Sequence, residues 1–263
     1  MLIVDTHCHA SPYWFEPVEI LLDEMARNDV GKAVLIQARG FYDNSYLVEC
    51  KRRFPGRFAV VVVVDTQAED APATLERWVE QGAGGIRLNP LARSPGDDPL
   101  AIWRKASDLG IAVSCLGTAR EFGSPEFEEL VRSLPDLSVV IEHLGGAEPG
   151  MPSPYEEYRK VLGLAKYPNT TMKVPGLGEL CPRPIPFIQP FPFPNVPPLI
   201  EMAIDAFGPS RLMWGSDFPP VAQREGYRNS LRFPMEHVSF RSEEDKEWVF
   251  GKTAASVWKL GPG

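Results

Sequence analysis

The feature that most constrains the fold is a regular alternation of short apolar runs with segments of helical spacing. In the segment 17–28, Val18, Leu21 and Met25 recur at helical intervals and form one apolar stripe. Strands that alternate with helices form βαβ units, which build a parallel sheet. Eight such units in 263 residues predict an α/β fold, a (β/α)8 TIM barrel formed as a single domain over residues 1–263. The expected strands are 2–6, 32–37, 58–65, 84–88, 111–116, 138–143, 170–174 and 211–215, and the expected helices are 17–28, 72–81, 100–109, 126–134, 155–165, 198–207 and 243–260.

A doubly wound open sheet is the alternative fold for this alternation. It would need a glycine-rich turn after the first strand, where the backbone approaches a bound phosphate group. In this chain, residues 7–12 read His-Cys-His-Ala-Ser-Pro. The sequence therefore favours the closed barrel.

Composition excludes several classes of partner. The net charge is −8 and no basic cluster occurs, which argues against nucleic acid and anionic membranes as partners. No apolar run reaches the ~20 residues that span a bilayer, and the N-terminus lacks the features of a signal peptide. The four cysteines are scattered, as is typical of a reducing compartment. We therefore expect a cytoplasmic protein that acts on a small molecule.

Two histidines, His7 and His9, stand at the end of the first expected strand. Successive side chains of a strand point to opposite faces, so the two imidazoles share one face. Such a pair can bind one metal ion or one substrate molecule. The alternative is a chance pair whose ring nitrogens are satisfied by backbone carbonyls.

Other polar residues stand at the ends of later strands. In a barrel, these carboxyl ends meet on one face, which carries the chemistry. Alternation places Val139, Ile141 and His143 on one face of the sixth strand. Asp217 follows the eighth strand. We expect His143 and Asp217 to converge with the histidine pair.

Several cationic residues are candidates for binding substrate. Arg87 and Lys173 lie late in the fourth and seventh strands, and their alternative role is a salt bridge or a solvated strand end. The loop after the eighth strand offers Arg224, Tyr227 and Arg228, and its arginines can bind a carboxylate bidentately. The alternative for that segment is a solvated, charged loop.

The segment 175–198 is rich in proline and phenylalanine. Proline fixes φ and removes hydrogen-bond donors, so the segment should be stiff and extended. One interpretation is a pocket wall in which Phe187, Phe191 and Phe193 contact the substrate. The other is a structural arm that packs on the barrel or on a second subunit of a homodimer.

Four motifs together resemble one family. They are Asp-Thr-His-Cys-His at residues 5–9, Gly-Ile-Arg-Leu-Asn in the fourth strand, Glu-His-Leu-Gly-Gly in the sixth and Trp-Gly-Ser-Asp-Phe-Pro in the eighth. In this order they resemble the amidohydrolase-2 branch of the amidohydrolase superfamily, which includes lactonases and decarboxylases. The resemblance implies a distorted (β/α)8 barrel in which His7, His9 and Asp217 bind a metal or orient the substrate. It also implies that His143 works beside the metal.

The fifth strand departs from the family pattern. Metal-dependent members usually supply a histidine there, whereas this chain offers Ser114, Cys115 or Thr118. A catalytic zinc site typically has three protein ligands and a water. The histidine pair and Asp217 supply three, and His143 or Cys115 is a candidate fourth. We expect a divalent metal, Zn²⁺ first, and the alternative is a metal-independent site like that of some lactonase-like members.

These observations predict a hydrolase that opens a lactone or related cyclic ester. A metal would polarise the carbonyl, and Asp217 would take the proton of the attacking water. Arg87 and His143 would stabilise the developing oxyanion. The alternative reaction is non-oxidative decarboxylation of an aromatic or unsaturated acid, and a third possibility is a barrel that only binds its ligand.

Overall fold

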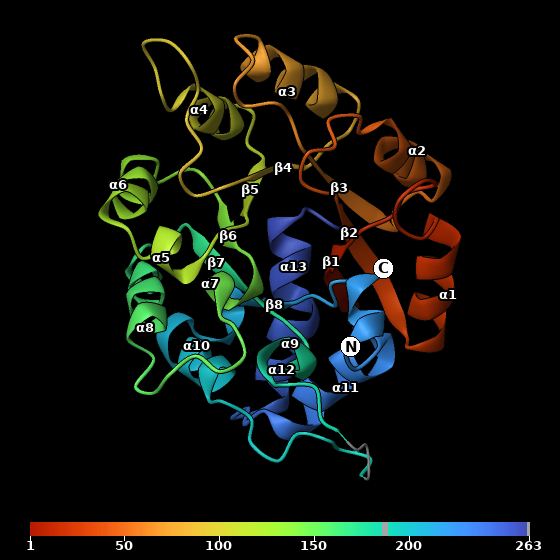
Figure 1. Cartoon of the computed structure of the whole chain (residues 1–263). Coiled ribbons are helices and arrows are strands. Elements are labelled where there is room, and N and C mark those ends of the chain that lie inside the picture. Colours follow the sequence, from red (N-terminus) through yellow and green to blue (C-terminus); the bar gives the residue numbers. More distant parts are fainter. Residues whose placement is uncertain (186–188, 262–263) are drawn as a thin grey trace.

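The computed structural model describes residues 1–185 and 189–261, and its eight parallel strands form one sheet. Each strand pairs with the next along the chain, and a bridge between Cys8 and Phe218 joins the first and last strands. Figure 1 shows the strands as a ring with helices outside it. The predicted (β/α)8 barrel is therefore confirmed. The strands are β1 Ile3–Cys8, β2 Val30–Ile36, β3 Phe58–Val62, β4 Gly85–Leu88, β5 Ala112–Cys115, β6 Val139–Ile141, β7 Thr170–Val174 and β8 Leu212–Trp214.

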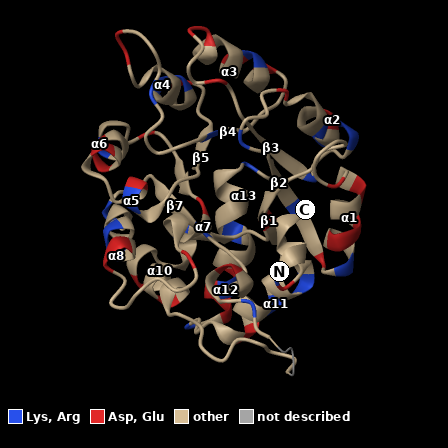
Figure 2. Ribbon diagram, in the orientation of Figure 1, with Lys and Arg blue, Asp and Glu red and all other residues tan. Residues whose placement is uncertain are grey.

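The helices bury apolar stripes against the outside of this ring. Helix α1 buries Val18, Leu21 and Met25, as its spacing predicts. Both charge signs are mixed over the outer helices (Figure 2). None of the helices in the described ranges has the length and apolar character needed to cross a bilayer. The main outer helices are α1 Val18–Arg27, α2 Ser45–Arg53, α3 Ala71–Glu80, α4 Ala101–Asp108, α6 Pro125–Ser133, α8 Glu156–Leu162, α10 Leu199–Phe207 and α11 Tyr227–His237.

Three helical regions differ from the sequence prediction. Helix α11 occupies the segment expected to be a charged loop, although Pro234 lies inside it. The single helix expected over 243–260 is divided into α12 Glu243–Glu247, a π-helical turn, η4 Trp248–Lys252, and α13 Thr253–Val257. Helix α2 was not expected at all, because its charged sequence gives a weak apolar stripe.

The barrel has two separate apolar layers, one inside the ring of strands and one between the strands and the outer helices. Val4, Val34, Val61 and Val140 belong to the interior layer. Ala254 and Trp258, from α13 and the residue after it, pack on the same cluster. One end of the barrel is therefore filled, and a ligand has access from the other end, where the strands finish.

A bulge in β1 turns the histidine pair toward the interior. The pairing of β1 with β2 slips by one residue between Asp5 and Cys8. Val4 lies in the interior layer whereas Cys8 lies in the outer layer, and an unbroken strand would put both on one side. The extra residue therefore brings His7 and His9 to the mouth of the barrel.

The expected direction of the side chains along β6 was wrong. Val139 and Ile141 belong to the outer layer and Val140 to the interior, so alternation directs Glu142 inward instead of His143. His143 leaves the strand with a left-handed backbone, at φ 50°. Its imidazole therefore reaches the mouth through a local turn and not through strand alternation.

Candidate active site

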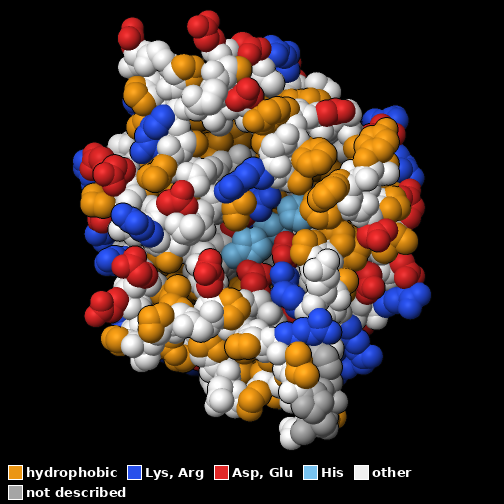
Figure 3. Space-filling model, in the orientation of Figure 1, with side chains coloured by type: hydrophobic (Ala, Val, Ile, Leu, Met, Phe, Trp, Pro, Cys, Tyr) orange, Lys and Arg blue, Asp and Glu red, His pale blue; other side chains and the backbone are white. Residues whose placement is uncertain are grey.

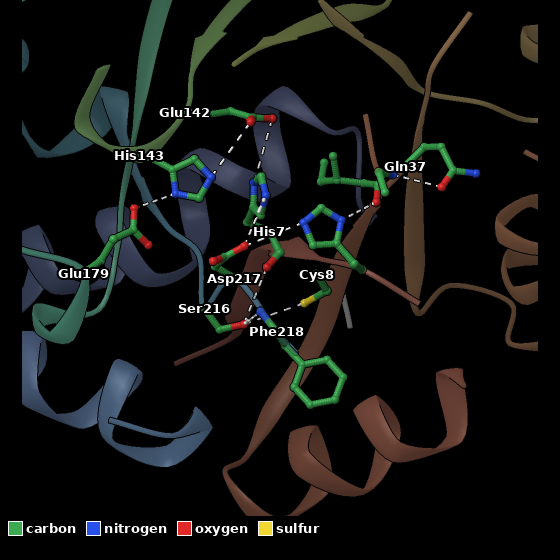
Figure 4. Close-up of polar contacts among 12 residues, drawn as sticks. His7, Cys8, Gln37, Glu142, His143, Glu179, Ser216, Asp217 and Phe218 are labelled. Carbon is green, nitrogen blue, oxygen red and sulfur yellow. Dashed lines mark hydrogen bonds and ion pairs between the residues drawn. The ribbon is translucent and has the colours of Figure 1, made fainter. Parts of the chain in front are cut away.

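The predicted histidines and acids gather where the strands end. Figure 3 shows the histidine side chains at the bottom of a hollow, bordered by positive and negative side chains and by hydrophobic ones. The ring centroids of His7 and His9 are 4.9 Å apart, and those of His7 and His143 are 4.5 Å apart. Phe15 stacks on His9 with centroids 5.1 Å apart. Asp217 completes the group, as Figure 4 shows.

The carboxylate of Asp217 lies between the paired histidines. Its Oδ1 is 3.7 Å from Nε2 of His7 and 3.6 Å from Nε2 of His9. Nδ1 of His9 donates to the carbonyl of Ile36 at 2.7 Å, which leaves Nε2 with a free lone pair. One ligand atom from each of the three residues lies within 4.8 Å of the others, so they could hold a metal ion. The donor set fits a divalent metal.

A buried ion network lies beneath this group. Arg87 Nη2 donates to Glu142 Oε2 at 2.7 Å, and Lys173 Nζ lies 3.5 Å from Glu142 Oε1. Ser114 donates to the same Oε1 at 2.6 Å and accepts from Lys173 at 3.0 Å. The alternative role considered for Arg87 and Lys173, a salt bridge, is thus present. Glu142 was overlooked in the sequence, because the side chain of the next residue, His143, was expected to point into the barrel.

Both cations of this network also reach His7. Lys173 Nζ lies 3.0 Å from Nδ1 of His7, and Arg87 Nη2 lies 3.5 Å from Nε2. Burial, reinforced by the charge of Lys173, holds the pKa of His7 well below its usual value, so the imidazole is neutral. Burial also lowers the pKa of Lys173 to about 8. At neutral pH Lys173 is therefore mostly charged and donates to Nδ1 of His7, and a metal at Nε2 of His7 would require Lys173 to lose that proton.

Glu142 carries the negative charge of this network. Its burial alone would raise the pKa, but the charges of Arg87 and Lys173 outweigh that and hold the pKa well below its usual value. His7, Glu142 and His143 form a second group that could hold a metal. Because Glu142 is engaged by two cations, we regard this group as the weaker metal site.

A second chain of contacts leads from His143 to Asp217. Nδ1 of His143 lies 2.6 Å from Glu179 Oε1, and Glu179 Oε2 lies 3.4 Å from Arg224 Nη2. Arg224 Nη1 donates to Asp217 Oδ2 at 2.9 Å. Glu179 comes from α9 Leu177–Leu180, inside the proline-rich segment. No pattern in that segment could have indicated it.

The remaining candidates lie away from the histidines. Tyr227 is buried, with its ring 6.2 Å from Trp214 and 5.9 Å from Phe218. Arg228 is exposed on α11, and no hydrogen bond or ion pair joins it to the described residues. Among the candidates from this segment, the structure thus brings only Arg224 to Asp217.

The candidates on the fifth strand are separated as well. Cys115 is buried in the outer apolar layer, so it does not face the histidines and is wrong as a fourth ligand. Thr118 is exposed and caps α5 Ala119–Phe122 through its hydroxyl, which accepts from the backbone N–H of Glu121. Ser114 alone faces the interior.

The proline-rich segment packs on α11. Phe191 stacks on His237 with centroids 3.7 Å apart and meets Phe233 edge-on. Phe193 is 5% exposed and also contacts Phe233. Phe187 lies outside the described residues. These contacts favour the structural-arm interpretation for Phe191 and Phe193.

Known proteins resemble this chain over most of its length. The Amidohydrolase family model, Amidohydro_2, matches residues 4–260. L-fucono-1,5-lactonase of Burkholderia ambifaria is 32% identical over 209 residues, which cover 74% of this chain and 67% of that protein.

Solved structures share the fold. A crystal structure of an amidohydrolase from Burkholderia multivorans with bound zinc has a TM-score of 0.80 and 21% identity, and the match covers 99% of this chain and 100% of that one. A protein provisionally assigned as a 2-pyrone-4,6-dicarboxylic acid hydrolase from Pseudomonas putida has a TM-score of 0.77 and 20% identity, with 100% and 99% covered. The family match spans every strand and all four motifs, and the chain belongs to the amidohydrolase family of enzymes.

Proposed function

We propose that the protein hydrolyses a small lactone or related cyclic ester. The observation that carries the proposal is the placement of opposite charges around His7. Its Nε2 lies 3.7 Å from the carboxylate of Asp217 and 3.5 Å from the guanidinium of Arg87. Ester hydrolysis needs a base for the attacking water and a positive group for the carbonyl oxygen, and both face one space here. The lactonase relative supports this choice of substrate.

Asp217 is the proposed base. Burial raises its pKa, but the neighbouring imidazole of His9 and the charges of His143 and Arg224 outweigh burial and lower it. The side chain is therefore ionised at neutral pH. It takes a proton from water as the water oxygen bonds to the carbonyl carbon. It returns the proton to the ring oxygen as the carbon–oxygen bond breaks, and the product is a hydroxy acid.

His7, His9 and Asp217 are the residues that would hold a divalent metal, and we propose Zn²⁺. When bound, such an ion polarises an ester carbonyl and lowers the pKa of water toward ~7. The zinc in the Burkholderia multivorans structure supports the identity. Because Glu179 holds Nδ1 of His143, only Nε2 is left, and as a fourth ligand this nitrogen would not also donate to the substrate.

Arg87 and His143 are the proposed hydrogen-bond donors to the oxyanion that forms on the carbonyl oxygen. Lys173 is 2% exposed, so we propose that it orients His7 and Glu142 and does not touch the substrate. Arg224 orients Asp217 and is the candidate for binding the carboxylate of the product. The structure gives no support to substrate contact by Tyr227 or Arg228.

The test is turnover of two substrate panels by the purified protein. Proton release from lactones, followed in a weakly buffered solution, should exceed the spontaneous rate and should disappear in Asp217→Asn. Release of carbon dioxide from aryl and unsaturated carboxylic acids without proton release from lactones would favour the decarboxylase alternative. Ligand binding without turnover of either panel would favour a non-catalytic barrel. Cell fractionation and a sizing column would test the expected cytoplasmic location and homodimer.

A further inference from the structure

We infer that a small cavity beside Arg87 binds a carboxylate group of the substrate, so that the protein prefers lactones bearing a carboxylate to neutral ones. The preference between lactones rests on the proposed lactone hydrolysis. The binding of a carboxylate in the cavity does not, and it is tested separately below.

The cavity has a volume of ≈ 160 Å³ and lies at the carboxyl ends of β2 to β5. Its polar lining consists of Arg39, Tyr42, Thr66, Arg87 and Asn89, and the rest of the lining is aliphatic or glycine. Arg87 is shared with the candidate active site, because its Nη2 lies 3.5 Å from Nε2 of His7. A group bound in the cavity would therefore be next to a lactone ring held at the histidines.

The charged side chains that line the cavity are all positive. Both ionisable side chains that line it and are charged at neutral pH are arginines, Arg39 and Arg87. Arg39 is exposed and has no hydrogen-bond or ion-pair partner within residues 1–185 and 189–261. Arg87 is paired with Glu142, but that carboxylate is shared with Lys173, so two cations face one anion. An anion in the cavity would balance the excess positive charge.

The nearby acid does not provide that balance. Glu121 is engaged by Asn89 at 3.0 Å and by the backbone N–H of Thr118 at 2.7 Å. It does not line the cavity. The backbone N–H of Thr118 is the main cause that lowers the pKa of Glu121, and the charge of Arg39 is a weaker one that acts without an ion pair between the two side chains. The guanidinium of Arg39 therefore remains available to a ligand, and a planar guanidinium matches a carboxylate through two parallel hydrogen bonds.

The volume restricts what can enter. Pockets that hold a whole drug-sized ligand have volumes of about 300–1,000 Å³. A cavity of ≈ 160 Å³ suits one carboxylate on a short arm while the ring stays outside, over His7 and Asp217. The matching substrate is a lactone with a carboxylate one or two carbons from its ring.

The first experiment compares two lactones with the same ring. One is a neutral 1,5-lactone with an exocyclic hydroxymethyl group, and the other carries a carboxymethyl group in its place, which puts the carboxylate one carbon from the ring. Wild type should favour the acid by about tenfold or more in kcat/KM, since a hydrogen bond to a charged group changes binding by roughly one to two orders of magnitude. Arg39→Gln should remove that preference through KM and leave turnover of the neutral lactone unchanged. Arg120→Gln changes an exposed arginine in α5, after β5, and is the matched control that should keep the preference.

The second experiment measures binding without turnover. Calorimetric titration with glutarate should show binding that glutaramide lacks, and Arg39→Gln should weaken glutarate binding by about tenfold or more. If wild type hydrolyses neither lactone but binds glutarate in this manner, the carboxylate site stands and the proposed hydrolysis fails. If glutarate and glutaramide bind alike, or if Arg39→Gln changes neither glutarate binding nor the preference between lactones, the inference is wrong.

Discussion

Arg224 and Asp217 form an ion pair that fixes the orientation of the proposed base. Nη1 of Arg224 donates to Oδ2 of Asp217 at 2.9 Å, and this leaves Oδ1 to face His7 and His9. Asp217 also has a left-handed backbone, at φ 59°. The side chain is thus held from one side by the arginine and directed by the turn, which prepares one oxygen for chemistry.

Arg224→Gln should lower kcat by about 10- to 100-fold, because it removes a charge-assisted hydrogen bond that positions Asp217. Steady-state kinetics on the best lactone would measure the loss. Arg228→Gln changes an exposed arginine near the start of α11, four residues further along the chain, and should leave kcat and KM unaltered. Equal losses in the two variants would speak against the positioning role and for a direct substrate role of Arg228.

Asp217→Asn should lower kcat by roughly 10²–10⁴ while the fold persists, since asparagine keeps the size of the side chain but accepts no proton at neutral pH. Kinetics and a thermal melt of the same sample provide the measurement. A variant with near wild-type kcat and normal melting would remove Asp217 from the mechanism.

Glu142→Gln should destabilise the protein by about 3–5 kcal/mol at pH 7, because it leaves Arg87 and Lys173 buried around a neutral group. The pKa of Glu142 is lower in the folded state than in the unfolded chain, where it is near 4.5. Its contribution to stability is therefore complete above that unfolded value and decreases as the pH falls below it.

The unfolding free energies of wild type and Glu142→Gln should consequently converge as the pH falls. Urea unfolding of wild type and Glu142→Gln at pH 7, 5 and 3.5 would show the difference in unfolding free energy shrinking with falling pH. A difference that stays constant over this range would mean that the charge of Glu142 is not what stabilises the fold.

Metal content provides a separate test of the histidine pair. Purified wild type should contain about one divalent ion per chain, and His9→Ala should lose most of it together with activity. His237→Ala removes a histidine that stacks on Phe191 at the C-terminal end of α11 and should retain the ion. Wild type that turns over lactones without stoichiometric metal, and that ignores chelators, would support the metal-independent alternative.

Phe193→Ala should cost about 3–5 kcal/mol of stability, because the ring is buried against Phe233 of α11. Ile185→Ala, in the same segment, changes a side chain that is 88% exposed and should cost little. Denaturant unfolding and KM would be measured together. A large rise in KM with normal stability would instead identify Phe193 as part of the pocket wall.

The barrel was predictable because its strands are short apolar runs with clear limits. β7 begins and ends as expected, and β4 and β5 each lie within the range expected for them. The position of the strand faces was not predictable, since one inserted residue in β1 reverses which side chains point inward. The sequence likewise does not say which alternate residues of β6 point inward. For this reason His143 was assigned to the inner face and Glu142 was overlooked.

Residues whose position depends on tertiary contacts could not be predicted from the sequence either. Glu179 lies in a segment whose prolines hide any periodic pattern, and only the folded chain brings it to His143 and Arg224. Helix α11 has a proline in its interior and depends on packing against Phe191 and Phe193. The histidine pair and Asp217 were predictable, because each follows directly from a strand end.

The filling of the barrel by Ala254 and Trp258 has a consequence for synthesis. These residues pack on Val4, at the opposite end of the sequence, and Cys8 must meet Phe218 to join the first and last strands. A nascent chain leaving the ribosome therefore holds an unclosed sheet, with unpaired edges on β1 and on the newest strand, until almost every residue in this segment of sequence has emerged. The barrel therefore closes late, and until then its open strand edges can pair with other chains.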